Sequence, residues 1–101
     1  MIKLMDLLVE SNNTLSSKQW KLVTDVLYAM YDDIVRVEHD KDYRGEYIRV
    51  VFSNYSEALS FYNRGVDVLS KIVNIQRTQS GGPKNWLGGS MFVVSYKVIA
   101  D

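Results

Sequence analysis

The segment 80–89 holds residue types that often bind ligands from a loop. Its ten residues include four glycines together with Lys84, Asn85 and Trp86. Glycines let a ligand approach backbone N–H groups, a lysine can meet a phosphate, and a tryptophan can stack on a base or anchor a protein partner. The segment lacks the residue order of a phosphate-binding P-loop. Two interpretations stay open: a ligand- or partner-binding loop, or a hairpin connection whose tryptophan packs back onto the core.

A second group of candidate binding residues is basic and aromatic and falls on expected strands and turns. Its members are Arg36, Arg77, Tyr43, Arg44, Tyr47 and Arg49, with Lys97 nearby. Sheet surfaces of this kind stack single-stranded bases, although the aromatic-rich strand pattern of the common RNA-binding sheets is absent. The alternative is ordinary cross-strand pairing of the arginines with Glu38 and Glu46.

Catalytic and metal-binding residue types are scarce in this chain. It has no cysteine, which removes thiol nucleophiles and thiolate zinc sites, and its single histidine, His39, excludes multi-histidine metal sites. Glu38 and Asp40 flank this histidine, and the candidate carboxylates of the region are Asp32, Asp33, Asp40 and Asp42. An acid–base or two-carboxylate site is one interpretation of this group, and solvated side chains at a helix end and a turn are the other. The sequence favours the second, so we expect a non-enzymatic protein with no catalytic residue, metal site or cofactor.

Two amphipathic helices are expected to support these residues. The first begins after Ser16, which can form a capping box with Gln19, and the second begins after Asn54, with Glu57 three residues on. The positions expected to face the core are Trp20, Val23, Leu27 and Met30 in the first helix and Leu59, Tyr62, Val66, Leu69 and Val73 in the second. Gly65 falls inside the second helix, where glycine is unfavourable, so we expect close packing at that position.

Four strands are expected at residues 34–39, 46–52, 75–79 and 91–99, with a polar turn at 40–45 and a glycine-rich loop at 81–89. Alternate apolar residues of the second and fourth strands share one face, which the helices should cover. The sequence therefore predicts a single α+β domain over residues 15–101, with a four-stranded antiparallel sheet and two helices on one face, ferredoxin-like in general architecture. Residues 1–14 are expected to be an N-terminal tag or a short amphipathic helix and linker.

The order helix, strand, strand occurs twice, and the two halves share residues. Asp25-Val26-Leu27 aligns with Asp67-Val68-Leu69, and Arg36 aligns with Arg77, once a gap at the helix end and an insertion in the second turn are allowed. We interpret this match as an (αββ)2 pseudo-repeat. A chance match between two amphipathic units is the alternative.

The sheet face away from the helices is expected to be partly apolar. It should hold Tyr47, Arg49, Val51, Met91, Val93, Ser95 and Lys97. Val51, Met91 and Val93 together would form an apolar patch, which is unusual on a surface that meets only water. We expect either the N-terminal segment or a second copy of the chain to cover it, and a homodimer through this sheet face is therefore one predicted arrangement.

The charge composition limits the classes of partner. Lysine plus arginine and aspartate plus glutamate both number 12, so the formal net charge is zero. A general nucleic-acid binder usually carries a basic excess, because neutralised phosphates supply most of its affinity. The sequence also contains no apolar run long enough to span a membrane and no secretory signal pattern. We therefore expect a cytoplasmic protein that does not contact membranes and that binds a protein partner.

Residues 1–10, MIKLMDLLVE, resemble the short capsid-targeting tags of the internal head proteins of T-even-type phages. Such tags end in an apolar residue, any residue and a glutamate, the site that the prohead protease reads. Here the tripeptide is Leu8-Val9-Glu10, which makes Glu10 the candidate processing site. The resemblance implies a phage protein that is packaged in the head and released into the host, where relatives counter host defences. The alternative is a short amphipathic helix that packs on the domain.

Together these patterns favour a small non-enzymatic binding or inhibitor protein, and the resemblance implies a phage origin and a host protein as its target. One alternative is a nucleotide or single-stranded nucleic-acid binding module that uses residues 81–89 and the surface arginines. Another is a structural protein of the virion interior. A phage protein of this kind would act in the host cytoplasm or the virion interior.

Overall fold

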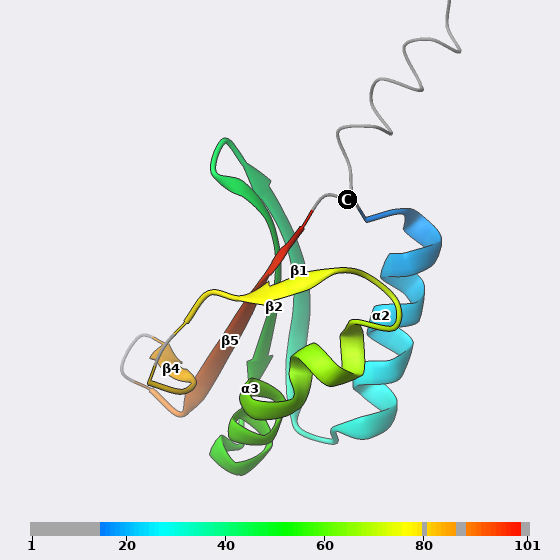
Figure 1. The fold of residues 1–101 in the computed structure, drawn as a ribbon. Coiled ribbons are helices and arrows are strands. Elements are labelled where there is room, and N and C mark those ends of the chain that lie inside the picture. The colour runs from blue at the N-terminus through cyan, green and yellow to red at the C-terminus, as the bar shows by residue number, and fades with distance from the viewer. Residues whose placement is uncertain (1–14, 80, 87–88, 100–101) are drawn as a thin grey trace, which may run out of the picture.

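A computed structural model of the chain describes residues 15–79, 81–86 and 89–99 (Figure 1). The N-terminal segment 1–14, with the candidate processing site Glu10, lies outside these residues. The described part comprises helices α2 (Ser17–Met30) and α3 (Tyr55–Leu69) and strands β1 (Ile34–Asp42), β2 (Gly45–Phe52), β3 (Ile75–Arg77), β4 (Lys84–Trp86) and β5 (Met91–Val98). The predicted α+β class is confirmed, since two helices accompany an antiparallel sheet.

The sheet has five strands, where the sequence predicted four. Strands β1, β2, β5 and β3 follow one another in that order, and β4 also pairs with β5. The segment 84–86, expected inside a loop, forms a strand because it pairs antiparallel with residues 91–93. Strand β3 pairs with the other end of β5, at residues 96–98. Since β2 occupies one edge of β5, the short strands β3 and β4 share the other edge.

Between β3 and β4 the side chains of Thr78 and Gln79 take the place of the main chain along β5. The Gln79 amide oxygen accepts the Ser95 N–H at 2.5 Å. The Gln79 amide nitrogen donates to the carbonyl oxygens of Val93, at 3.4 Å, and Gly82, at 3.1 Å. The Thr78 hydroxyl donates to the Ser95 carbonyl oxygen at 3.3 Å. These side chains thus form hydrogen bonds with backbone groups of β5 that a continuous neighbouring strand would otherwise bond.

Both helices pack on the same face of the sheet, as predicted, and enclose the core with it (Figure 1). Buried core residues are Val23 and Leu27 from α2, Ala58, Phe61 and Leu69 from α3, and Ile48, Val50, Phe52, Val94 and Tyr96 from the sheet. The predicted capping box of Ser16 and Gln19 is confirmed. The prediction for Met30 is wrong: its side chain is exposed because the helix ends there, and Tyr31 turns into the core instead. Neither described helix combines the length and the apolar character that crossing a membrane requires.

Most of the buried stripe of α3 lies one position closer to the N-terminus than the sequence predicted. Its buried residues are Ala58, Phe61, Gly65 and Leu69, whereas Leu59, Tyr62 and Val66 are half-buried along the flank. Gly65 explains the difference, because the ring of Tyr96 occupies the space beside it. A Cβ atom at Gly65 would lie only 2.5 Å from the Tyr96 Cε2 atom. The Tyr96 hydroxyl donates at 2.7 Å to the carbonyl oxygens of Phe61 and Tyr62. The close packing predicted at Gly65 is thus confirmed.

The start of α3 is bonded to the chain that leaves α2. Asn54 caps α3 as predicted, with its side-chain oxygen accepting the Glu57 N–H. The Glu57 carboxylate accepts from the N–H groups of Asp32, at 3.2 Å, and Asp33, at 2.9 Å. Asp32 and Asp33 therefore lie just after the end of α2, as expected if these acids are helix-end residues and not part of a catalytic site.

Strands β1 and β2 form a longer hairpin than the sequence predicted. The first strand continues to Asp42, which pairs with Gly45, so the turn contains only Tyr43 and Arg44. Gly45 has a φ of 145°, a backbone conformation that residues with side chains rarely adopt. The Asp42 side chain accepts the Arg44 N–H at 2.8 Å and closes the turn.

Candidate functional site

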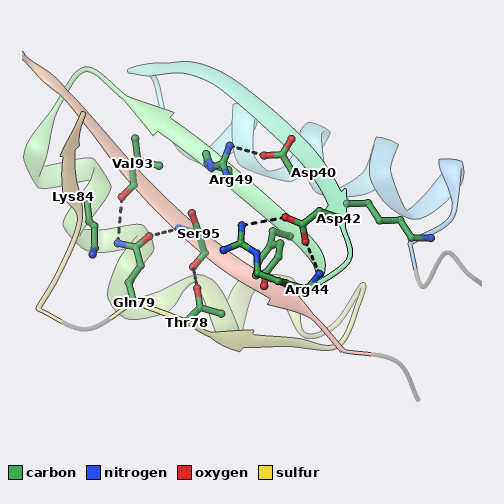
Figure 2. A pocket seen from close by; sticks show the side chains of 11 residues that line it. Asp40, Asp42, Arg44, Arg49, Thr78, Gln79, Lys84, Val93 and Ser95 are labelled. Carbon is green, nitrogen blue, oxygen red and sulfur yellow. Dashed lines mark hydrogen bonds and ion pairs between the residues drawn. The ribbon is translucent and has the colours of Figure 1, made fainter. Parts of the chain in front are cut away.

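The sheet face opposite the helices is hollowed by a groove of about 520 Å³ (Figure 2). Strands β2 and β5 form its floor through Tyr47, Arg49, Val93 and Ser95. The β1–β2 hairpin borders the groove on one side, and Thr78, Gln79 and Lys84 border it on the other. The border residues are Asp40, Lys41, Asp42 and Arg44 from the hairpin and Thr78, Gln79 and Lys84 from the opposite segment. All of these lining residues except Val93 carry a polar or charged group.

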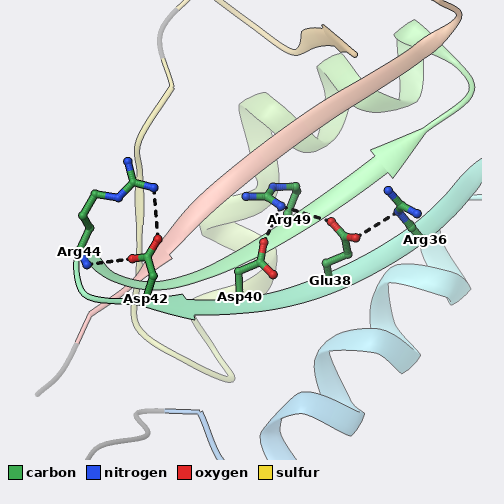
Figure 3. Close-up of polar contacts among 6 residues, drawn as sticks. All are labelled: Arg36, Glu38, Asp40, Asp42, Arg44 and Arg49. Carbon is green, nitrogen blue, oxygen red and sulfur yellow. Dashed lines mark hydrogen bonds and ion pairs between the residues drawn. The ribbon is translucent and has the colours of Figure 1, made fainter. Parts of the chain in front are cut away.

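A chain of ion pairs runs along the hairpin side of this face (Figure 3). Arg36 contacts Glu38 at 3.2 Å. Arg49 reaches across from β2 and contacts Glu38 at 3.4 Å and Asp40 at 2.5 Å. Each pair is partly exposed, so its contribution to stability is small, but the connected contacts restrict the orientation of both guanidinium groups. The Arg49–Glu38 contact is the cross-strand pairing that one interpretation of the sequence expected, whereas Arg36 and Glu38 pair within β1.

A separate ion pair lies at the hairpin turn. The Arg44 side chain contacts the Asp42 carboxylate at 3.2 Å, and its guanidinium carbon lies 5.7 Å from the centre of the Tyr43 ring. The backbone N–H of Arg44 donates to Asp42 and lowers the pKa of the Asp42 carboxyl group below its ordinary value. This carboxylate is thus ionised at neutral pH. Tyr43 is 95% exposed and protrudes from the tip of the hairpin.

Lys84 borders the groove on the opposite side and has different surroundings. It is exposed and pairs across the ladder with Val93 of β5. No carboxylate of the described residues contacts it. Lys84 also lines a smaller neighbouring hollow of about 250 Å³ together with Arg49, Asn85 and Val93. Lys84 and Arg49 therefore border both hollows.

The structure brings four of the predicted binding residues together in the groove: Arg44, Tyr47, Arg49 and Lys84. Arg36 and Tyr43 lie on the same hairpin but outside the lining. Asn85 lines the smaller hollow, and its side chain donates to the Gly89 carbonyl oxygen at 2.7 Å. The backbone of Trp86 belongs to β4, while its side chain lies outside the described part of the chain.

Arg77 lies apart from the other candidate residues, so it does not join the basic and aromatic surface that one interpretation of the sequence proposed. In β3 it pairs with Tyr96, whose side chain points toward the helices. The Arg77 guanidinium accordingly lies over the ring of Tyr62 in α3, 4.6 Å from its centre, and donates to the Asn63 carbonyl oxygen at 3.5 Å. Its position follows from the register of β3, which the sequence alone does not determine.

The predicted apolar patch on the open face is smaller than expected. Val51 is fully buried, because it lies in the middle of the sheet, in register between Arg36 of β1 and Val93 of β5. Val93 is half-buried in the groove floor, and Met91 is exposed. The open face is therefore dominated by its polar groove.

His39 occupies a position that sequence reasoning missed. It was expected in a solvated turn, but β1 continues past it and directs it toward the helices, in phase with Val37. Its Nε2 atom contacts the buried carboxylate of Glu46 at 2.5 Å, and its ring centre lies 5.4 Å from that of Trp20. The Glu46 carboxylate thus contacts His39, where one interpretation of the sequence expected a pairing with an arginine. Residues 38–42 are all polar or charged, so no apolar alternation in the sequence signals that the strand continues past His39.

The open face presents charged and hydrogen-bonding groups. Among the described residues, no group of three or more histidine, aspartate or glutamate side chains is arranged to hold a metal ion. The groove instead gathers guanidinium, ammonium, carboxylate, amide and hydroxyl groups on a rigid sheet. No family model, curated protein or solved structure matches the chain. The groove geometry is thus the basis for assigning a function.

Proposed function

We propose that this protein is a small non-enzymatic binding module that holds a segment of a partner protein in the groove of its open sheet face. The observation that carries the proposal is the groove itself, about 520 Å³ in volume, with polar and charged side chains on both borders. Small-molecule pockets are predominantly apolar, whereas contacts between proteins combine charged, polar and aromatic groups. The protruding Tyr43 adds an aromatic side chain of the kind that anchors partners.

The pairing of the arginines favours a protein partner over a nucleic acid. Arg36, Arg44 and Arg49 each already contact a carboxylate. A phosphate backbone would have to compete with these carboxylates, which weakens the electrostatic gain that supplies most nucleic-acid affinity. Arg77 faces the helices and cannot join the groove. A nucleotide or single-stranded nucleic acid at residues 81–89 is thus the less favoured alternative.

The source of the partner is proposed from the resemblance of residues 1–10 to phage capsid-targeting tags. On that basis the chain is a phage protein that acts on a host protein in the host cytoplasm. A role inside the virion and a homodimer through the open face are the competing arrangements. The proposal that the groove holds a protein segment is the same whether that segment comes from a host protein, a virion protein or a second copy of the chain.

The strand order also supports the proposed internal repeat and the ferredoxin-like architecture. Each helix precedes a hairpin-like pair of strands, β1–β2 after α2 and β3–β5 after α3. The second strands of the two units, β2 and β5, pair at the centre of the sheet, and the first strands lie outside. In this proposal β4 belongs to the insertion that lengthens the second unit.

A groove-filling substitution tests the proposal. Ser95 lies in the groove floor, so Ser95→Trp should fill it, and Ser56→Trp on the exposed first turn of α3 is the matched control. In capture from an extract of the source cells, quantified by mass spectrometry, a specific partner should be retained by the wild type and by Ser56→Trp and lost by Ser95→Trp. Equal capture by all three proteins would place the binding surface elsewhere.

A further inference from the structure

The groove has an uneven distribution of charge. Its lining includes four cationic side chains, Lys41, Arg44, Arg49 and Lys84, but only two carboxylates, Asp40 and Asp42, although the whole chain has no net charge. Both carboxylates lie on the hairpin border (Figure 2). On the opposite border the described lining residues are Thr78, Gln79 and Lys84, which include one cation and no acid. One side of the groove is therefore mixed in charge, and the other is positive.

Lys84 is the cation that remains available for a ligand. Arg44 and Arg49 contact Asp42 and Asp40, respectively, whereas Lys84 has no carboxylate partner among the described residues. Lys84 and Gln79 both line the groove, and the Gln79 side chain is already bonded to β5 (Figure 2). Arg49 and Lys84 lie on the same face of the sheet, opposite Ser95 and Val93, respectively, and both border the smaller hollow.

A neutral hydrogen-bond donor lies on the same face of the sheet as this cation. The hydroxyl group of Ser95 lies in the floor on the same face, and its side chain makes no hydrogen bond to another described residue. Strand β5 alone lies between the strands of Lys84 and Arg49, and two strand spacings correspond to about 10 Å, so at low salt an anion at Lys84 also experiences the guanidinium of Arg49. A carboxylate at this position gains a charge-assisted hydrogen bond without displacing an existing ion pair.

We propose that the Lys84 end of the groove is a subsite for an acidic side chain, and that the partner segment carries a glutamate or aspartate there. This inference rests on the proposed function and names the chemistry of the partner. The acids Asp40 and Asp42 on the opposite border disfavour a strand with a phosphate at every nucleotide, because repeated anions would lie against them. A peptide avoids this repulsion, since it can present a carboxylate to Lys84 and a neutral or basic side chain to the hairpin.

The test uses the full ¹⁵N-labelled chain and a capped tetrapeptide, acetyl-Ala-Glu-Glu-Ala-amide, with acetyl-Ala-Gln-Gln-Ala-amide as the uncharged control. The glutamate peptide should shift the amide resonances of Lys84, Val93 and Ser95 at low salt, and the glutamine peptide should not. Lys84→Gln should weaken the apparent affinity by about threefold or more, the scale of a partly exposed ion pair. Lys18→Gln, at an exposed position on α2, should leave it unchanged.

Equal binding of the two peptides, or equal binding by the wild type and Lys84→Gln, would overturn the acidic subsite. Shifts at these residues with inorganic phosphate but not with the glutamate peptide would also overturn it, in favour of a phosphate ligand. The proposed function is tested separately by Ser95→Trp. If that substitution abolishes partner capture while Lys84→Gln does not change it, the groove binds a partner but the acidic subsite is wrong.

Discussion

Gln79 provides the sharpest test of how the groove is built, because one side chain replaces main-chain bonds between β3 and β4. Gln79→Ala removes the acceptor for the Ser95 N–H and the donor for the carbonyl oxygens of Val93 and Gly82. Each hydrogen bond contributes about 0.5–1.5 kcal/mol net. Because the site is only half-buried and water can replace part of the loss, we expect a total cost of about 2 kcal/mol.

Urea unfolding followed by circular dichroism measures this cost. With a urea dependence of about 1–2 kcal/mol per molar for a chain of this size, the midpoint should fall by roughly 1–2 M. Gln76→Ala is the matched control, because Gln76 is exposed on β3, and its change should stay within about 0.5 kcal/mol. A loss from Gln79→Ala as small as that from Gln76→Ala would refute the bridging role of Gln79.

Gln79→Glu separates the acceptor from the donor. The introduced carboxylate keeps an acceptor for Ser95 but places a second anionic oxygen against the carbonyl oxygens of Val93 and Gly82. The neutral acid can still donate to a carbonyl, so the folded state should raise the pKa of the introduced carboxyl group. The deficit relative to the wild type should therefore be small at pH values below the ordinary glutamate pKa of about 4.3 and grow as the pH rises through the raised value. A deficit independent of pH would contradict this geometry.

Further predictions concern the core and the helix ends. Gly65→Ala should lower the free energy of unfolding by about 1–2 kcal/mol, because overpacking against Tyr96 exceeds the gain of about 1 kcal/mol in helix propensity; a more stable variant in urea would contradict the packing. His39→Ala should cost about 2 kcal/mol by removing a partner of the buried Glu46 carboxylate, and much less in a Glu46→Gln background; equal costs in the two backgrounds would show that the contact is unimportant. Burial raises the pKa of the Tyr96 hydroxyl above its ordinary value of 10.0, so this group ionises in the unfolded state before it ionises in the folded state. The free energy of unfolding should therefore be unaffected by this group below pH 10 and should fall as the pH rises through the raised pKa. Urea unfolding that shows no greater loss of stability at alkaline pH than in Tyr96→Phe would refute this. Ser16→Ala should cost about 1 kcal/mol, and thermal unfolding with an unchanged midpoint would argue against the capping box.

The main elements of the fold could be predicted from the sequence because local patterns determine them. The capping box at Ser16 and Gln19 and the alternation of residues 46–52 both appear in the structure. The prediction missed β4, whose three residues resemble a loop in composition and become a strand only by pairing with β5. It also displaced the buried stripe of α3, because the contact between Gly65 and Tyr96 joins residues distant in sequence.

The candidate site was predictable in part. Strand alternation correctly placed Tyr47, Arg49 and Ser95 on one face, where they form the groove floor. It could not exclude Arg77, because the register of the short strand β3 is determined by its partner strand. Gln79 was not singled out either, since an isolated glutamine carries no signal that it will replace main-chain bonds.

Photo-crosslinking from two tyrosine positions tests the central claim most directly. Tyr47 lies in the groove, and Tyr28 is exposed on α2 on the opposite side of the sheet, so each can be replaced with benzoylphenylalanine in an otherwise unchanged chain. If the groove holds a partner segment, irradiation in an extract of the source cells should join one specific protein to position 47 and not to position 28, and Ser95→Trp should abolish the product. A product that forms at position 28 alone, or one at position 47 that contains only nucleic acid, would contradict the account.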